Sequence, residues 1–168
     1  LFSNSASNNE TNLAATAVTG FTLNPGAGKT CSYSGIIANF AAGTTITKTG
    51  DGTQIFSGNH TYTGATAVNG GKLFINGNQT AASGDLTVGA NASLGGTGTI
   101  GGNVSIVNTG KLEFNFSTDF STHDKLELAA AKALSFGANA TLTITSTGGA
   151  STGLYTLVTA PGGIGALP

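Results

Sequence analysis

The sequence carries very little charge. Only 8% of its 168 residues are Asp, Glu, Lys or Arg, whereas globular domains average about 25%. The formal net charge is −1 and arginine is absent, so the chain offers no basic surface to nucleic acid. No run approaches the roughly 18 apolar residues of a membrane-spanning helix. We therefore expect neither a nucleic-acid partner nor a membrane span.

Methionine and tryptophan are also absent, and cysteine occurs once, as Cys31. A single cysteine cannot form an intrachain disulfide, and free cysteines are among the most buried residue types. We therefore expect Cys31 to be buried rather than paired between molecules. The chain is rich instead in glycine, of which it has 27, and in Thr, Ser and Asn. Threonine suits half-buried strands and glycine suits tight turns, so this composition favours β structure.

Residues 51–77 (DGTQIFSGNHTYTGATAVNGGKLFING) combine alternating apolar positions with turn signals. Ile55, Leu73 and Ile75 occupy the alternate positions, and the turn-forming groups SGN, YTG and NGG lie between them. Alternation indicates short strands with one buried face, and clustered Gly and Asn indicate turns. The run therefore predicts strands of a β structure.

The same run resembles the autotransporter-associated β-strand repeat, whose signature is close to GxGTxxxSGxNTYTGxTxVNxGxL. The matching residues are Gly52, Thr53, Ser57, Gly58, Asn59, Thr61, Tyr62, Thr63, Gly64, Thr66, Val68, Asn69, Gly71 and Leu73. His60 departs from the signature, and we expect it to be a surface substitution. Residues 33–37, 47–52, 86–106 and 153–160 extend the resemblance over most of the chain beyond Tyr33. The resemblance implies a secreted bacterial β-solenoid displayed outside the cell.

Beyond residue 77, apolar residues recur at alternate positions in small groups separated by turns. The groups comprise Leu86, Val88, Leu94, Ile100, Val104, Ile106, Leu112, Phe114, Phe116, Leu126, Leu128, Leu134, Phe136, Leu142 and Ile144. Whole motifs recur as well: residues 69–76 (NGGKLFIN) return as 108–115 (NTGKLEFN), and 88–94 (VGANASL) as 136–142 (FGANATL). Repeated units stack and share one continuous core, so we predict an all-β fold, a parallel β-helix (β-solenoid). Short strands at these intervals also fit a β-sandwich, which is the alternative.

The pattern divides the chain into two parts. Residues 1–50 form a divergent N-terminal extended or capping segment, and residues 51–168 form the β-solenoid. Residues 1–18 are a candidate donor strand for a neighbouring sheet. Residues 32–40 (SYSGIIANF) are expected to form a strand. In residues 124–133, the alternation of Leu126 and Leu128 favours a strand over a helical turn.

Two glycine motifs suggest nucleotide binding but fail on context. Residues 25–30 (PGAGKT) end like a phosphate-binding loop, but Leu23 stands where its first glycine belongs and a strand-like run follows. Residues 96–101 (GTGTIG) match GxGxxG, yet a strand-like run follows there too, where dinucleotide binding needs a helix. Both are interpreted as turns, and we expect no cofactor.

The only ionisable cluster in the sequence consists of Asp119, His123, Asp124 and Glu127. These residue types could perform acid–base catalysis or hold a metal. They lie in a Ser/Thr-rich connection, so we interpret them as a solvated polar turn. A calcium-binding β-roll is not expected either, because Ile100 follows GGTGT where an Asp ligand belongs. We therefore predict no catalytic, cofactor-binding or metal-binding residues, and no enzyme.

The sequence supports two non-catalytic functions. The aromatics Tyr33, Tyr62 and Tyr155 could stack on sugars, but their positions favour core packing. An uncapped solenoid end exposes strand edges, and head-to-tail contacts build open filaments. We therefore predict a secreted structural protein that self-assembles into an extracellular filament or surface layer, with itself as the partner. The alternative is a monomeric cell-surface adhesin that binds glycans or matrix.

Overall fold

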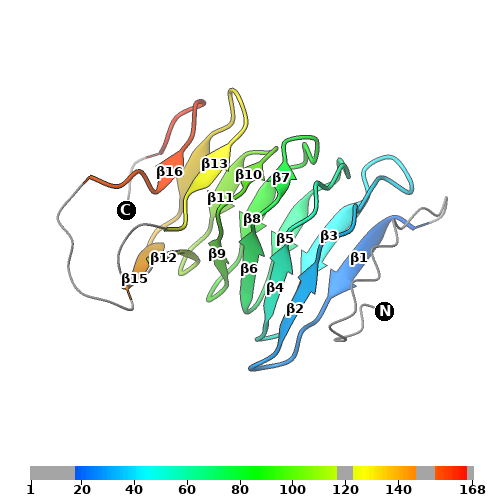
Figure 1. The fold of residues 1–168 in the computed structure, drawn as a ribbon, viewed down its shortest axis with the longest axis horizontal. Helices are drawn as coiled ribbons and strands as arrows, with labels where there is room; N and C mark the ends of the chain where they lie inside the picture. The colour runs from blue at the N-terminus through cyan, green and yellow to red at the C-terminus, as the bar shows by residue number, and fades with distance from the viewer. Residues whose placement is uncertain (1–17, 117–122, 147–153, 166–168) are drawn as a thin grey trace.

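The computed structural model describes residues 18–116, 123–146 and 154–165. Within these ranges the chain is all-β and winds through three parallel sheets (Figure 1). The coils lie side by side along the long axis, from the N-terminal strands at one end to the C-terminal strands at the other. Among the described residues, no helix has the length and apolar character needed to cross a membrane.

Each coil contributes one strand to each long sheet. Sheet 1 contains β1 (Gly20–Leu23), β3 (Thr45–Lys48), β5 (Thr66–Val68), β8 (Leu86–Val88), β11 (Val104–Ile106) and β14 (Leu134–Phe136). Sheet 2 contains β2 (Thr30–Tyr33), β4 (Thr53–Phe56), β6 (Lys72–Ile75), β9 (Ser93–Gly95), β12 (Lys111–Phe116) and β15 (Thr141–Ser146). Sheet 3 is shorter, with β7 (Asn78–Gln79), β10 (Thr99–Ile100), β13 (Leu126–Leu128) and β16 (Val158–Thr159).

Every named strand pair is parallel and in register. In sheet 1, for example, Ile46 pairs with Thr66, and Thr66 with Leu86. A parallel partner one turn later in the chain is the geometry of a β-helix, because each connection must travel round the coil. The structure therefore confirms the predicted parallel β-solenoid over the β-sandwich. The strand predicted at Leu126 and Leu128 is confirmed as β13.

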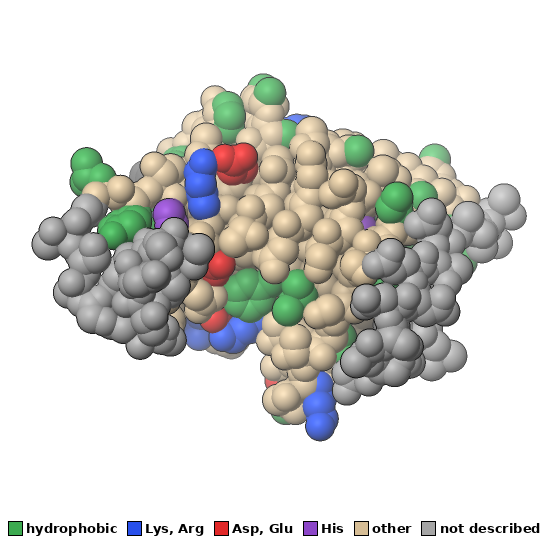
Figure 2. Space-filling view, in the orientation of Figure 1, with side chains coloured by type: hydrophobic (Ala, Val, Ile, Leu, Met, Phe, Trp, Pro, Cys, Tyr) green, Lys and Arg blue, Asp and Glu red, His purple; other side chains and the backbone are tan. Residues whose placement is uncertain are grey.

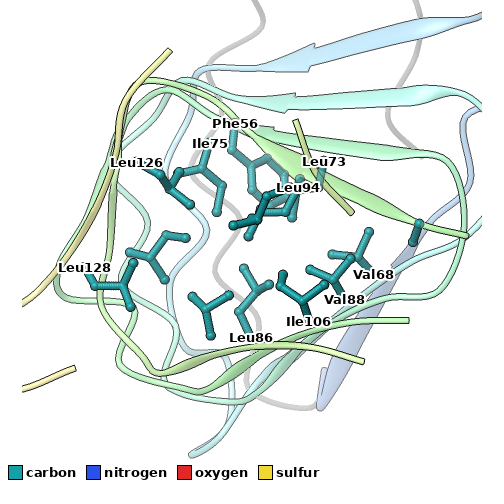
Figure 3. Close-up of a cluster of buried hydrophobic side chains, with 14 of the residues drawn as sticks. Phe56, Val68, Leu73, Ile75, Leu86, Val88, Leu94, Ile106, Leu126 and Leu128 are labelled. Carbon is teal, nitrogen blue, oxygen red and sulfur yellow. The ribbon is translucent and has the colours of Figure 1, made fainter. Parts of the chain in front are cut away.

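The core fills the space between the three sheets (Figure 3). Alternate residues of each strand point inward, as the burial of Leu112, Phe114 and Phe116 in β12 shows. The same parity buries most of the predicted apolar positions from Leu86 to Leu134. The outer surface carries few charges, and Figure 2 shows them scattered over the face of the coils. Thr, Ser and Asn therefore provide most of the contact with water.

Strand β4 corrects one expected orientation. Ile55 was predicted to face the core, but Gln54 and Phe56 are buried and Ile55 lies on the outer face. The register explains the difference, because Gln54 pairs with the fully buried Leu73 of β6 and must share its face. A shift of one residue moves a whole strand to the opposite face. The neighbouring coil thus sets the orientation of β4 against its local pattern.

The first fifty residues are only partly described. Strands β1, β2 and β3 occupy the same sheets as the later strands, so residues 20–48 are built into the ladder. The change of sequence pattern after residue 50 is therefore not a break in the sheets. The strand expected at residues 32–40 ends at Tyr33. Residues 1–17, most of the candidate donor strand, lie outside the described residues.

The two ends of sheet 2 are less covered than expected. Leu142 and Ile144 continue the inward rows of Leu112 and Phe114, and they are 47% and 55% exposed. Within the described ranges, β15 has a neighbouring strand on one side only. Cys31 was expected to be buried; it lies in β2, the strand at the other end, and is half-buried. In both cases the side chain points inward, and the strand at that end has no further partner in the part of the chain that the structure describes.

The corners between sheets bring successive coils into very close contact. A Cβ atom at Gly84 would collide with the carbonyl oxygen of Gly64, and one at Gly64 with that of Gly43. At the corner after sheet 2, Cβ atoms at Gly58, Gly77 and Gly98 would collide with the carbonyl oxygens of Gly35, Gly58 and Gly77, respectively. Parallel strands lie roughly 4.8 Å apart. Side chains at these corners would push the coils beyond that spacing, so only glycine fits.

We predict that Gly84→Ala lowers the free energy of unfolding by about 2–3 kcal/mol, because the methyl group must displace the backbone of the preceding coil. Gly26→Ala is the matched control, since a Cβ atom there meets nothing within 4 Å. Urea unfolding followed by circular dichroism measures both. Equal stability of the two variants would contradict the steric explanation.

Candidate functional site

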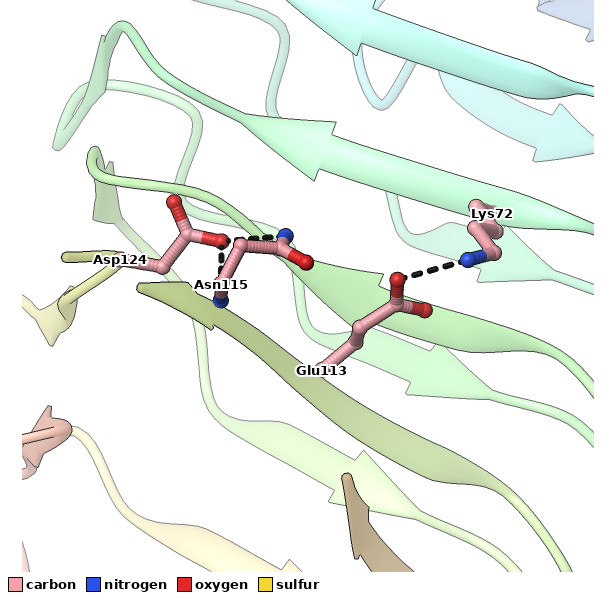
Figure 4. Close-up of polar contacts among 4 residues, drawn as sticks. All are labelled: Lys72, Glu113, Asn115 and Asp124. Carbon is pink, nitrogen blue, oxygen red and sulfur yellow. Dashed lines mark hydrogen bonds and ion pairs between the residues drawn. The ribbon is translucent and has the colours of Figure 1, made fainter. Parts of the chain in front are cut away.

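The predicted ionisable cluster does not form a common site in the described part of the chain. Asp119 lies outside the described residues. His123 forms an antiparallel β-bridge with Phe116, and the two side-chain rings stack with their centroids 5.2 Å apart. Asp124 accepts hydrogen bonds from the backbone N–H of Asn115 at 3.0 Å and from its side-chain amide at 2.8 Å (Figure 4). Each of these contacts holds the chain next to β12.

Glu127 forms an ion pair with Lys125. Its carboxylate lies 2.5 Å from Nζ of Lys125 on the outer surface. Among the described residues, no three His, Cys, Asp or Glu side chains are grouped so that they could hold a metal ion. The described members of the predicted cluster therefore have separate structural contacts.

The first glycine motif forms a turn before β2, as predicted, whereas residues 96–101 include strand β10 (Thr99–Ile100). Residues 25–29 connect β1 to β2, with the N–H of Lys29 donating to the carbonyl of Gly26 at 3.0 Å. Residues 96–98 connect β9 to β10. A strand follows in each case, so neither turn opens a helix that could bind a phosphate through its N-terminus.

His60 corrects the expectation of a surface substitution. Its side chain is fully buried, and Nδ1 accepts a hydrogen bond from the backbone N–H of Ile37 at 3.1 Å. The ring of Phe56 packs edge-on against the imidazole, with ring centroids 4.5 Å apart, and the ring of Tyr33 stacks on it with centroids 5.8 Å apart. Burial lowers the pKa of His60 from 6.5 to about 4, because the charged imidazolium would lose its hydration. His60 is therefore a neutral core residue that links two coils.

Tyr62 is also part of the core, as predicted. It is 4% exposed, and its hydroxyl lies 2.7 Å from the hydroxyl of Thr66, which faces inward from β5. A buried hydroxyl needs such a partner, because leaving it unpaired is costly. Burial raises the pKa of Tyr62, and the hydrogen bond to Thr66 partly opposes this. The spacing between Tyr62 and Thr66 in the repeat thus allows their hydroxyls to form one buried hydrogen bond.

Lys48 is another buried polar residue of the repeat region. Its ammonium donates to three backbone carbonyls, those of Thr49 at 2.7 Å and of Gly50 and Gly70 at 2.9 Å. The side chain is fully buried between coils, and burial lowers its pKa while Asp51 acts in the opposite direction. An ammonium has three donors, so the three carbonyls satisfy it completely. Lys48 therefore holds the turn of one coil against that of the next.

The outer face of sheet 2 carries the only other ion pair among the described residues. Lys72 extends from β6 across β9 to β12, where Nζ lies 2.6 Å from Oε1 of Glu113 (Figure 4). The Lys72 side chain is 45% exposed but that of Glu113 only 12%. Beside them on this face lie the outward residues Ile55 and Phe74, which pair directly. This face thus combines apolar, cationic and anionic groups.

Sequence reasoning missed this arrangement. Phe74 and Glu113 occur at equivalent positions of the recurring segments KLFIN and KLEFN. The register shows that Gly95 lies between them, because Phe74 pairs with Gly95 and Gly95 with Glu113. The repeat alignment is the signal that could have placed both residues on one outward row.

Comparison with known proteins agrees with this geometry. Residues 46–73 match the model of the Passenger-associated-transport-repeat, which confirms the predicted resemblance for this segment. The adhesin BmaC autotransporter of Brucella suis biovar 1 (strain 1330) is 38% identical over 61 residues. That alignment covers 36% of this chain and 2% of the relative. No solved structure matches the chain. The chain therefore carries a passenger-type repeat and corresponds to a very small part of that relative.

We predict that His60 makes the fold acid-sensitive. The pKa of about 4 in the folded state lies below the ordinary 6.5, so the unfolded state binds the proton first. The stability that depends on neutral His60 is fully present above pH 6.5 and declines as the pH falls toward 4. The difference between the two pKa values corresponds to about 3 kcal/mol in the free energy of unfolding. Urea unfolding between pH 7 and pH 4 measures this loss.

His60→Asn should lack this component of the pH dependence, because its side-chain oxygen can accept from Ile37 and does not titrate. His123→Asn is the matched control and should retain it. Parallel pH profiles for the wild type and His60→Asn would contradict the prediction.

Proposed function

We propose that this chain is a segment of a cell-surface passenger protein whose role is adhesion rather than catalysis. The observation that carries the proposal is the passenger repeat at residues 46–73, which forms coils of a continuous solenoid. The similarity to an autotransporter adhesin supports the same role and a location outside the cell. The relative is far longer, so its binding partners are not transferred to this chain.

The architecture suits display of a binding surface. The inward rows and the glycine corners hold the backbone in place. The outward positions of the sheets make no contribution to the core, so they can vary without loss of the fold. In the described part of the predicted ionisable cluster, His123, Asp124 and Glu127 have separate contacts and do not share a site. This arrangement favours binding over a broad face and gives no support to a reaction.

Attachment of purified protein to epithelial cells tests the proposal. Beads coated with this chain should bind a cell layer or a matrix-coated surface at least about tenfold more than albumin-coated beads, a difference of about 1.4 kcal/mol. Beads coated with protein unfolded in urea provide the second control. Binding no greater than that of albumin beads would contradict an adhesive role.

Self-assembly into filaments is a second candidate, supported by the C-terminal end of the ladder. Among the described residues, strand β15 pairs only with β12, and the inward side chains of Leu142 and Ile144 are exposed. Such an edge can accept a further parallel strand from another copy. A head-to-tail contact of this kind does not close and generates a filament.

Paired charge substitutions on β15 test this candidate. Ile144→Lys places a charge on the inward row and should abolish concentration-dependent association. Thr143→Lys on the outward row of the same strand should leave association largely intact. Analytical ultracentrifugation and negative-stain microscopy provide the measurements. A wild-type protein that stays monomeric at high concentration would contradict self-assembly.

A further inference from the structure

The outer face of sheet 2 holds an aromatic ring laid across a neighbouring strand. Phe74 points outward from β6 and pairs with Gly95 of β9. A Cβ atom at Gly95 would lie 2.5 Å from the backbone carbonyl oxygen of Glu113, 2.8 Å from Cε1 of the Phe74 ring and 3.1 Å from its Cδ1. The ring therefore occupies the space that a side chain at position 95 would fill. Phe74 is half-buried and retains contact with solvent.

Polar groups are fixed at the far side of this ring. Glu113 follows Gly95 in the same outward row, and its side chain is only 12% exposed. The ion pair with Lys72, at 2.6 Å, holds its carboxylate over the small residues of β9. The next outward residue of β12, Asn115, has its side-chain amide bound to Asp124 at 2.8 Å. The carboxylate and amide are thus held in place before any ligand arrives.

The row changes from apolar to polar along the solenoid axis. Ile55, Phe74, Gly95 and Glu113 succeed one another on four adjacent strands. In Figure 2, hydrophobic side chains gather beside acidic ones in the lower middle of the face. We call the surface formed by Ile55, Phe74, Gly95, Glu113 and Lys72 the Phe74 platform.

We propose that the Phe74 platform binds a neutral saccharide chain. The C–H face of a sugar ring packs on an aromatic ring, as other apolar groups do. Sugar hydroxyls donate to a carboxylate and accept from an ammonium. The paired charges of Lys72 and Glu113 balance, so the platform offers no net attraction to a polyanion. This proposal rests on the adhesive function and names its ligand class.

A purely structural role for Phe74 would require an apolar side chain over Gly95 but not an aromatic ring. An aromatic ring can cover a glycine in a sheet and protect its backbone. Leucine would give apolar cover without a flat face for a sugar to stack on. Phe74→Leu therefore separates the two roles, because it should keep the fold and lose the ligand.

Affinity electrophoresis through native gels that contain dextran, galactomannan or xyloglucan tests the proposal. At least one of these neutral polysaccharides should retard the wild-type protein. Phe74→Leu should weaken the retardation about tenfold, equivalent to about 1.4 kcal/mol. Phe74→Tyr should retain it, and Glu113→Gln should reduce it. Leu154→Ser, which removes an exposed apolar side chain from another part of the chain, should leave it unchanged.

Urea unfolding confirms that each variant is folded. The proposal is overturned if no gel retards the wild type, or if folded Phe74→Leu is retarded as strongly as the wild type. Phe74-dependent binding to a matrix protein without polysaccharide binding would also overturn it. The two proposals fail separately: cell attachment without retardation refutes the saccharide site alone, and retardation without attachment refutes the adhesive role.

Discussion

The close approach of successive coils at their corners is the constraint on which this fold depends. Parallel strands must remain about 4.8 Å apart for their backbone hydrogen bonds to form. At Gly64 and Gly84 the carbonyl of the preceding coil already occupies the space of a Cβ atom. The signature glycines of the repeat lie at such corners. The glycines of the motif are therefore required by the spacing between coils. Each glycine corner leaves room for the next coil to pair with the one before it.

The same closeness creates a demand for buried polar partners. Corner carbonyls and amides that point into the solenoid cannot reach water, and an unpaired buried group is costly. Lys48 satisfies three carbonyls, and His60 accepts from the N–H of Ile37. In each case the side chain connects two coils. Burial lowers the pKa of both residues, and neither is positioned to act on a substrate.

Much of the fold could be predicted from the sequence, because inward parity and glycine spacing are visible in the residues themselves. Leu86, Val104 and Leu126 are buried as predicted. Ile55 and His60 were misplaced because their environment depends on the neighbouring coil, which a local pattern does not contain. Ile144 faces inward as predicted, but no described strand covers it. The outer-face arrangement of Phe74 and Glu113 depends on register between strands, so no linear motif reveals it.

Inward and outward positions of the strands are under different constraints. Inward positions and corners are constrained by packing, whereas an outward position needs only a residue that tolerates water and a strand. Across sheet 2 these outward positions are mostly Thr, Ser, Asn or Lys. Ile55 and Phe74 depart from that pattern on adjacent strands, and the side chain of Glu113 is only 12% exposed. The core requires none of these three side chains, and their grouping over Gly95 forms the surface that we propose as a saccharide site.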